Sequence, residues 1–156
     1  MDWNMVGAIA TCFTAGGVIV ALLQIRLARK QSVTQFEDEM SRQYREILKT
    51  IPLKALLGEK LSQEEFEEAE DGIYHYLDPS NEQVFLRQNN RVRQETWKSW
   101  CDGIESNLSR WAFEQVWMRI QAEVPNNFLE LQTLQAQNFK SDPRCWRELI
   151  HPKTSS

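Results

Sequence analysis

The sequence predicts an all-α chain: an N-terminal transmembrane helix continuing into a long amphipathic stalk, then a small cytoplasmic helical bundle. The residues Met5–Leu23 carry no charge and are followed at once by basic residues. No glycine or proline separates Leu23 from Ile51, and no stretch alternates as a strand would. The expected parts are an anchor over residues 1–25, a stalk over 26–51, a cytoplasmic domain over 52–140 and a tail over 141–156.

The apolar run Met5–Leu23 has the length of a membrane span. As a helix it would be about 28 Å long, close to the hydrocarbon thickness of a bilayer. A cleaved secretion signal is the first alternative, but no lysine or arginine precedes the run and no small-x-small cleavage site follows it. The second alternative is a buried helix of a soluble protein, but such apolar stretches are usually shorter than this run. We therefore expect an uncleaved anchor.

Arg26, Arg29 and Lys30 follow the run and predict its orientation. Basic flanks stay in the cytoplasm, so the C-terminal domain would be cytoplasmic and the N-terminus outside. The three cysteines have no pairing or metal-binding spacing, which fits a reducing compartment. We expect a bacterial inner-membrane protein with a single span.

One face of the predicted span carries small side chains at steps of three and four. Lipid tails are as apolar as leucine, so spans associate where small residues let backbones approach closely. The pattern predicts a homo-oligomer or docking on a partner span; a lone anchor that tolerates small residues is the alternative. The candidate association face is Gly7, Ala10, Thr14, Gly17 and Ala21.

The stalk is expected to be one amphipathic helix that runs to Pro52, with Asp38 and Arg42 paired on its polar side. Further on, Ser62 and Glu65 have the spacing of a capping box. The apolar phase after them continues across Pro79, which favours one kinked helix. The apolar face of the stalk comprises Phe36, Met40, Tyr44, Ile47 and Ile51.

Asn89-Asn90 would end the kinked helix, because asparagine tolerates the left-handed conformation. A third helix is expected over about Gln94–Glu105, broken by Ser106-Asn107. Ser109 would cap a fourth helix, which Pro125 would stop. The last short helix would carry Phe128, Leu131 and Leu134, and the tail would touch the body through Trp146, Leu149 and Ile150.

Charge and composition restrict the function. With 22 acidic and 18 basic side chains the net charge is −4, so no basic face for nucleic acid is expected. The acidic segment Glu64–Asp71 predicts a solvated helix face or a docking surface for a basic partner. Four tryptophans lie between Trp97 and Trp117; their helical spacing favours core over interface.

No catalytic constellation is visible, so we expect neither an enzyme nor a cofactor or metal site. His75 has Asp71 four residues earlier, but two ligands do not make a metal site. Cys101 has no histidine nearby in the sequence. The polar trio Asn81, Glu82 and Gln83 is the candidate partner-binding site, or else it caps or bridges helices internally.

The segment from Tyr74 to Trp117 resembles a group of small bacterial proteins that pair an N-terminal membrane helix with a helical cytoplasmic body and have no assigned activity. Pro79 and Asn90 depart from the group's pattern at a helix and at a turn. The resemblance implies topology and fold only. It rests on Asn81-Glu82-Gln83, Trp97, Trp100, Gly103-Ile104, Asn107-Leu108, Phe113 and Trp117.

Three functions follow from the sequence. The first is a membrane-anchored interaction or regulatory module with an unknown protein partner, suggested by the stalk, the small-residue face and the missing catalytic set. The second is a membrane effector of the toxin or phage-defence type, acting through assembled spans. The third is an enzyme or small-ligand sensor that uses the tryptophan cluster and His75.

Overall fold

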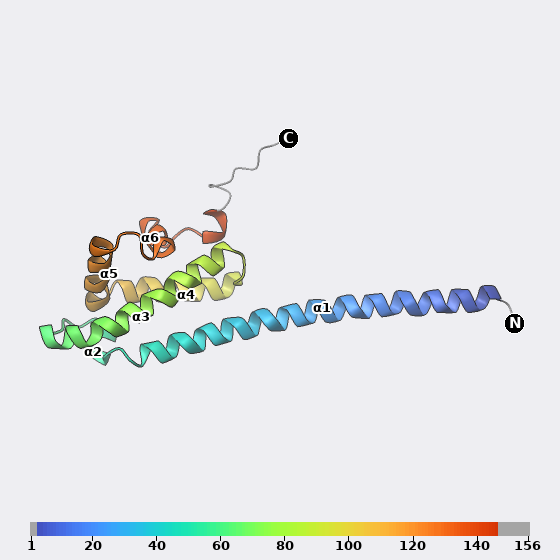
Figure 1. Ribbon diagram of the computed structural model, residues 1–156, viewed down its shortest axis with the longest axis horizontal. Helices are drawn as coiled ribbons and strands as arrows, with labels where there is room; N and C mark the ends of the chain where they lie inside the picture. Colours follow the sequence, from blue (N-terminus) through green and yellow to red (C-terminus); the bar gives the residue numbers. More distant parts are fainter. Residues whose placement is uncertain (1–2, 147–156) are drawn as a thin grey trace, which may run out of the picture. The chain divides into compact units, whose positions relative to one another are not determined.

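The computed structural model describes the backbone of residues 3–146 and the side chains of residues 20–146. The chain divides into two compact units, Met1–Asp38 and Glu39–Ser156. Over the described backbone every regular element is a helix and there is no strand, which confirms the all-α class (Figure 1). The predicted boundaries at residues 25, 51 and 140 stay predictions.

Helix α1 (Trp3–Leu48) is continuous over 46 residues, as expected for an uninterrupted run of helix formers. It ends at Leu48 and not at Pro52. Proline disfavours the helical conformation in the residue before it, and the amides of Thr50 and Ile51 donate to carbonyls three residues back, which closes the helix in a tight turn.

Among the helices whose side chains are described, none is both long and apolar enough to cross a membrane. Most of the predicted span Met5–Leu23 precedes residue 20, where the described side chains begin. The same holds for four residues of its association face, Gly7, Ala10, Thr14 and Gly17. The last residue of that face, Ala21, is exposed, and so are the topology charges Arg26, Arg29 and Lys30.

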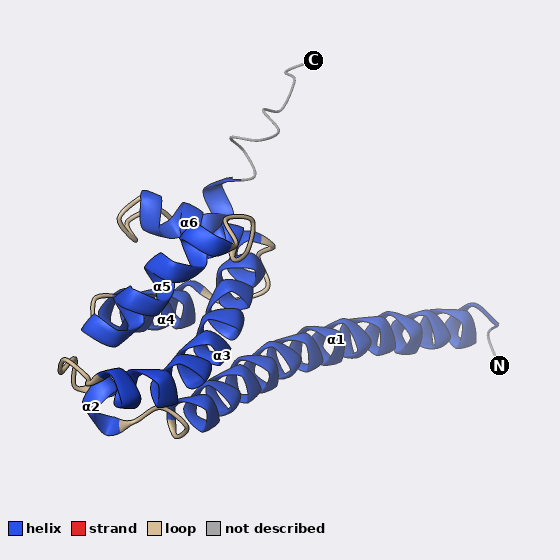
Figure 2. Ribbon diagram, turned by 60° about the vertical axis from the view of Figure 1, so that its left-hand side comes forward, coloured by secondary structure: helices blue, strands red, loops and turns tan. Residues whose placement is uncertain are grey.

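Helix α3 (Gln63–Gln88) is the central element of the second unit. It packs against α4 (Gln94–Leu108), α5 (Trp111–Glu123), α6 (Leu129–Ala136) and the 3-10 turn η1 (Pro143–Cys145), while the single turn α2 (Leu53–Leu56) packs on α5 (Figure 2). Its apolar face forms the core with side chains from the helices around it. Fully buried core residues include Ile73, Tyr76, Leu77, Val84, Phe113, Trp117, Leu131 and Leu134.

The predicted ends of α3 are confirmed. Ser62 Oγ accepts from the Glu65 amide at 3.3 Å, and the Glu65 carboxylate accepts from the Ser62 amide at 3.0 Å, which completes the capping box. The helix continues through Pro79 and ends at Gln88; Asn89 is its C-cap, and Asn90 after it has a left-handed φ of 57°. Asparagine can therefore take the place that glycine usually has in such a turn.

The α3 backbone also passes close to the turn after α1. A Cβ at Gly72 would lie 3.1 Å from both Ile51 Cγ1 and Thr50 Oγ1, tighter than ordinary van der Waals contact. Glycine at this position lets the two segments approach.

The expected break at Ser106-Asn107 is wrong, because α4 continues to Leu108. The Asn107 side chain is buried and donates to Tyr44 Oη at 2.8 Å and to Tyr76 Oη at 3.0 Å. These tertiary bonds occupy the amide that would otherwise compete with the helix backbone. Ser109 does not cap α5 either; its hydroxyl donates to the Ser106 carbonyl at 2.8 Å.

The predicted pair of Arg42 with Asp38 is wrong, because Arg42 pairs with Glu39 instead. Its Nη2 lies 2.6 Å from Glu39 Oε1 and its Nε 3.1 Å from Oε2, so the guanidinium takes both carboxylate oxygens one helical turn away. Two parallel hydrogen bonds explain the choice of partner.

The connection from α5 to α6 contains a strained residue. Helix α5 stops before Pro125, as predicted, and Phe128 precedes α6 with a left-handed φ of 56°. Its ring lies 5.7 Å from that of Tyr74 and 6.3 Å from that of Trp117. These ring contacts hold a conformation that bulky residues avoid.

The chain after α6 returns to α3 through a partly buried ion pair. Arg87, on the last turn of α3, donates to both carboxylate oxygens of Asp142, with Nε–Oδ1 at 2.8 Å, and to the Val92 carbonyl at 2.8 Å. Trp146 is buried, as expected, while Leu149 and Ile150 lie outside the described residues. The hydrogen bonds from Arg87 hold the pKa of Asp142 below its ordinary value of 3.8.

Replacing Asp142 by asparagine should destabilise the body, because it leaves the buried Arg87 charge without its counter-ion. We expect a loss of about 2 kcal/mol in the free energy of unfolding at neutral pH, below the 3–5 kcal/mol typical of fully buried pairs, since Asp142 is partly exposed. Denaturant unfolding of the two proteins measures it. The matched control Asp102→Asn changes an exposed carboxylate and should cost less than about 0.5 kcal/mol.

The difference in the free energy of unfolding between wild type and Asp142→Asn should also depend on pH. Since the folded pKa of Asp142 is lowered, its contribution is complete above the ordinary value of 3.8 and is lost as the pH falls through the lowered value. The gap between wild type and Asp142→Asn should therefore narrow below pH 3.8. A gap that stays constant on acidification would contradict this account.

Candidate functional site

Four polar side chains of α3 lie on its buried face. Tyr76, Ser80, Gln83 and Arg87 follow one another at steps of four, three and four, and their exposed fractions are 0, 0, 1 and 3%. We call these four residues the polar row. Burying a polar group is unfavourable unless it finds a hydrogen-bond partner, so the partners of each member matter.

Three members of the polar row are satisfied within the protein. Tyr76 accepts from Asn107, and burial raises the pKa of its phenol, which stays protonated. The Ser80 hydroxyl donates to the Tyr76 carbonyl at 2.8 Å. The Arg87 guanidinium is shared between Asp142 and the Val92 carbonyl.

Gln83 is the exception. Its Oε1 is buried and has no hydrogen-bond partner among the described residues. Such an acceptor costs about 1–3 kcal/mol relative to a satisfied one. The Gln83 side chain lines a pocket of about 230 Å³.

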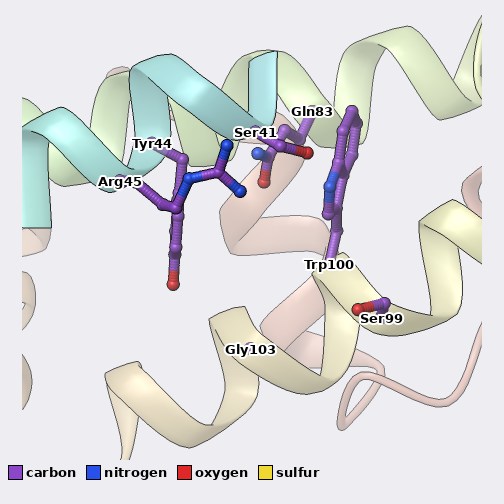
Figure 3. Close-up of a pocket in the computed structure, with 7 residues that line it drawn as sticks. All are labelled: Ser41, Tyr44, Arg45, Gln83, Ser99, Trp100 and Gly103. Carbon is purple, nitrogen blue, oxygen red and sulfur yellow. The ribbon is translucent and has the colours of Figure 1, made fainter. Parts of the chain in front are cut away.

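Two other helices complete the pocket. The last turns of α1 supply Ser41, Tyr44 and Arg45, and α4 supplies Ser99, Trp100 and Gly103. In Figure 3 the Arg45 guanidinium and the Gln83 amide extend into the space between the Tyr44 and Trp100 rings. The pocket is therefore lined by both polar and aromatic side chains.

Tyr44 is fixed in the pocket wall. Its hydroxyl accepts from Asn107, and its ring meets that of Tyr76 edge to face with centroids 5.6 Å apart. Because Asn107 and Tyr76 are both buried, this wall is formed before any ligand arrives.

Arg45 brings an unneutralised positive charge to the pocket. Its neighbours on α1 are paired, Arg42 with Glu39 at 2.6 Å and Lys49 with Glu46 at 2.8 Å. Within residues 20–146 the Arg45 guanidinium makes no ion pair. The pocket therefore combines a cation with a buried acceptor.

The structure separates the members of the predicted trio. Asn81 bridges α3 to α6: its Nδ2 donates to Glu130 at 2.9 Å, and its Oδ1 accepts from the Leu131 amide at 3.0 Å. Glu82 is exposed to solvent. The two hydrogen bonds confirm the interpretation of Asn81 as an internal cap or bridge. Of the trio, only Gln83 lines the pocket.

The tryptophans fall into two groups. Trp97 and Trp117 are buried, as expected for core, and Trp117 donates to Gln135 at 2.7 Å. Trp100 and Trp111 are half-buried. Trp100 lines the pocket, whereas Trp111 packs edge to face on Phe66.

The other candidate groups are set apart from the pocket. His75 is exposed and lies 3.6 Å from Asp71, the pairing expected from their spacing. Burial raises the pKa of Cys101 to about 11, so the thiol is protonated at neutral pH. Among the residues whose side chains the structure describes, no three histidine, cysteine or acidic residues converge as metal ligands would.

A second hollow, of about 260 Å³, lies beside Trp97, Cys101 and Asp142. Its buried polar groups already have partners, since the Cys101 thiol lies 3.5 Å from the Phe139 carbonyl and Asp142 is bound to Arg87. It offers no unmet acceptor comparable to Gln83.

Sequence reasoning missed Ser41, Tyr44, Arg45 and Ser99 as pocket residues, whereas Trp100 belongs to the tryptophan cluster that it had singled out. The polar row itself was a usable signal. A tyrosine, a serine, a glutamine and an arginine at helical spacing, in phase with buried Ile73 and Leu77, predict polar groups inside the core. Which member lacks a partner depends on helices far away in the sequence.

Comparison with known proteins adds no assignment. No protein-family model, no curated protein and no solved structure matches the chain.

Asn81→Ala should weaken the docking of α6, because the Leu131 amide loses the acceptor that serves as its N-terminal cap. We expect a loss of about 1 kcal/mol in the free energy of unfolding, the usual cost of removing a cap. The neighbour Glu82→Ala is the matched control and should change stability by less than about 0.5 kcal/mol. Thermal unfolding of both variants measures this; equal effects would refute the bridging role.

Proposed function

We propose that the protein is a membrane-anchored helical module whose cytoplasmic body serves recognition and regulation. The single observation that carries the proposal is the uncharged run Met5–Leu23 with Arg26, Arg29 and Lys30 directly after it. In this proposal the N-terminus lies outside the bacterial inner membrane and the body inside.

The described part of α1 supports an apolar environment around the end of this run. Large apolar side chains there are more than half exposed, although a soluble protein normally covers such a group. A helix that is apolar all round is usually surrounded by lipid or by protein. The exposed residues are Val20, Leu22, Leu23, Ile25 and Leu27.

The body supports recognition because its distinctive feature is a pocket and not a set of reactive groups. The pocket residues include neither histidine nor cysteine, and Cys101 is held as a protonated thiol elsewhere. A membrane effector that acts through assembled spans is the second candidate, favoured by the small residues Gly7, Ala10, Thr14, Gly17 and Ala21.

Membrane fractionation of cells that express the full chain tests the anchor. The wild-type chain should stay in the membrane pellet after alkaline carbonate extraction. The double variant Phe13→Arg/Val18→Arg should be released, because each charge at the centre of a span costs about 2.5–3.5 kcal/mol. The control Leu57→Arg changes an exposed apolar residue of the body and should remain in the pellet. Wild-type chain in the supernatant without detergent would sink the proposal.

Cysteine labelling tests the orientation. Cys145 is exposed on the body, whereas Cys101 is buried, so a membrane-impermeant maleimide should report on Cys145. We expect labelling of Cys145 only after spheroplasts are opened. In an Asn4→Cys/Cys145→Ser variant, intact spheroplasts should be labelled. The opposite pattern would reverse the topology while leaving the anchor in place.

A further inference from the structure

We propose that the pocket between α1, α3 and α4 binds a small molecule of the free α-amino-acid class, with a carboxylate held by Arg45 and an adjacent donor held by Gln83. The inference concerns the second compact unit alone and does not depend on the membrane anchor.

The Gln83 amide specifies a donor. Every other member of the polar row has a partner inside the protein, so the fold can satisfy buried polar groups on this face of α3. In the polar row only Gln83 Oε1, on a side chain that is 1% exposed, has no partner among the described residues, and that side chain lines the pocket. A ligand that reaches this buried oxygen would complete it with an N–H or O–H group.

Arg45 specifies an anion. Its guanidinium lines the pocket and has no carboxylate partner among the described residues, although paired side chains flank it on the same helix. A planar guanidinium matches a carboxylate with two parallel hydrogen bonds. An anion and a donor on one molecule, held by two groups of the same pocket, is the pattern of an amino acid.

The aromatic walls suit the rest of such a molecule. Tyr44 and Trp100 present rings to the pocket, and rings accept both apolar groups and an ammonium on their faces. The hydroxyls of Ser41 and Ser99 add adaptable hydrogen-bonding groups at its edge.

The size of the pocket limits the ligand. At about 30 Å³ for each water, 230 Å³ corresponds to about eight non-hydrogen atoms. Pockets for drug-sized ligands and cofactors measure about 300–1,000 Å³, so this pocket suits a smaller molecule. A free amino acid with a small or medium side chain fits.

Thermal-shift and calorimetric measurements on the purified full chain in detergent micelles test the site. The first probes are the common free L-amino acids, of which at least one should raise the unfolding temperature, since a ligand that binds only the folded state stabilises it. For that amino acid, the methyl ester removes the carboxylate and the des-amino carboxylic acid removes the donor. Both analogues should bind at least about tenfold more weakly.

Variants separate a binding role from a structural one. Gln83→Leu removes the unmet acceptor at nearly constant volume, so it should unfold at the same or a higher temperature while losing at least about tenfold in affinity. Arg45→Gln, at an exposed residue, should lose affinity to a similar degree. The control Arg42→Gln, one turn away and paired with Glu39, should bind like the wild type.

Three outcomes would overturn the proposal. They are the absence of any amino-acid-dependent shift, an ester or des-amino acid that binds as well as the parent, and a Gln83→Leu protein that is destabilised yet binds normally. If Gln83→Leu does not fold, Arg45→Gln decides the matter alone. A chain that purifies without detergent but binds an amino acid would refute the anchor and leave this site standing.

Discussion

The arrangement of the body depends on one buried amide. Asn107 on α4 donates to the hydroxyls of Tyr44 on α1 and Tyr76 on α3, so a single side chain joins three helices. If it were removed, two phenols would lose a donor in an apolar core, where Tyr76 also packs edge to face on Phe113 at 5.2 Å. The same three helices enclose the pocket. The geometry of the candidate site is therefore set by the core and not by mobile loops.

The elements that sequence reasoning predicted are those with local causes. The capping box at Ser62, the left-handed end at Asn90 and the stop at Pro125 each depend on residues within one turn, so they could be predicted without knowledge of the fold. The break at Asn107 was wrong for the opposite reason. Its helix-breaking tendency is local, but its two partners lie 31 and 63 residues away along the chain.

The candidate site was only partly predictable for the same reason. Gln83 was singled out within a polar trio, but its neighbour Asn81 bridges helices, and nothing in the sequence distinguishes the two. In the sequence, Arg45 is one of several charged residues of the stalk, which are expected to face solvent. It becomes notable only because the charges around it are paired and because α4 brings Trp100 to the same pocket. The periodicity of the sequence predicts which polar groups are buried. Which of them lack a hydrogen-bond partner depends on the tertiary structure.

Phe128 has a consequence for the way the body opens. A bulky residue in the left-handed region costs about 1–2 kcal/mol, which the contacts with Tyr74 and Trp117 offset only while the segment is closed. Separating these rings releases that strain, so part of the free energy lost with the contacts is recovered. Opening of the segment around Phe128 should therefore cost less free energy than the loss of its ring contacts alone would require.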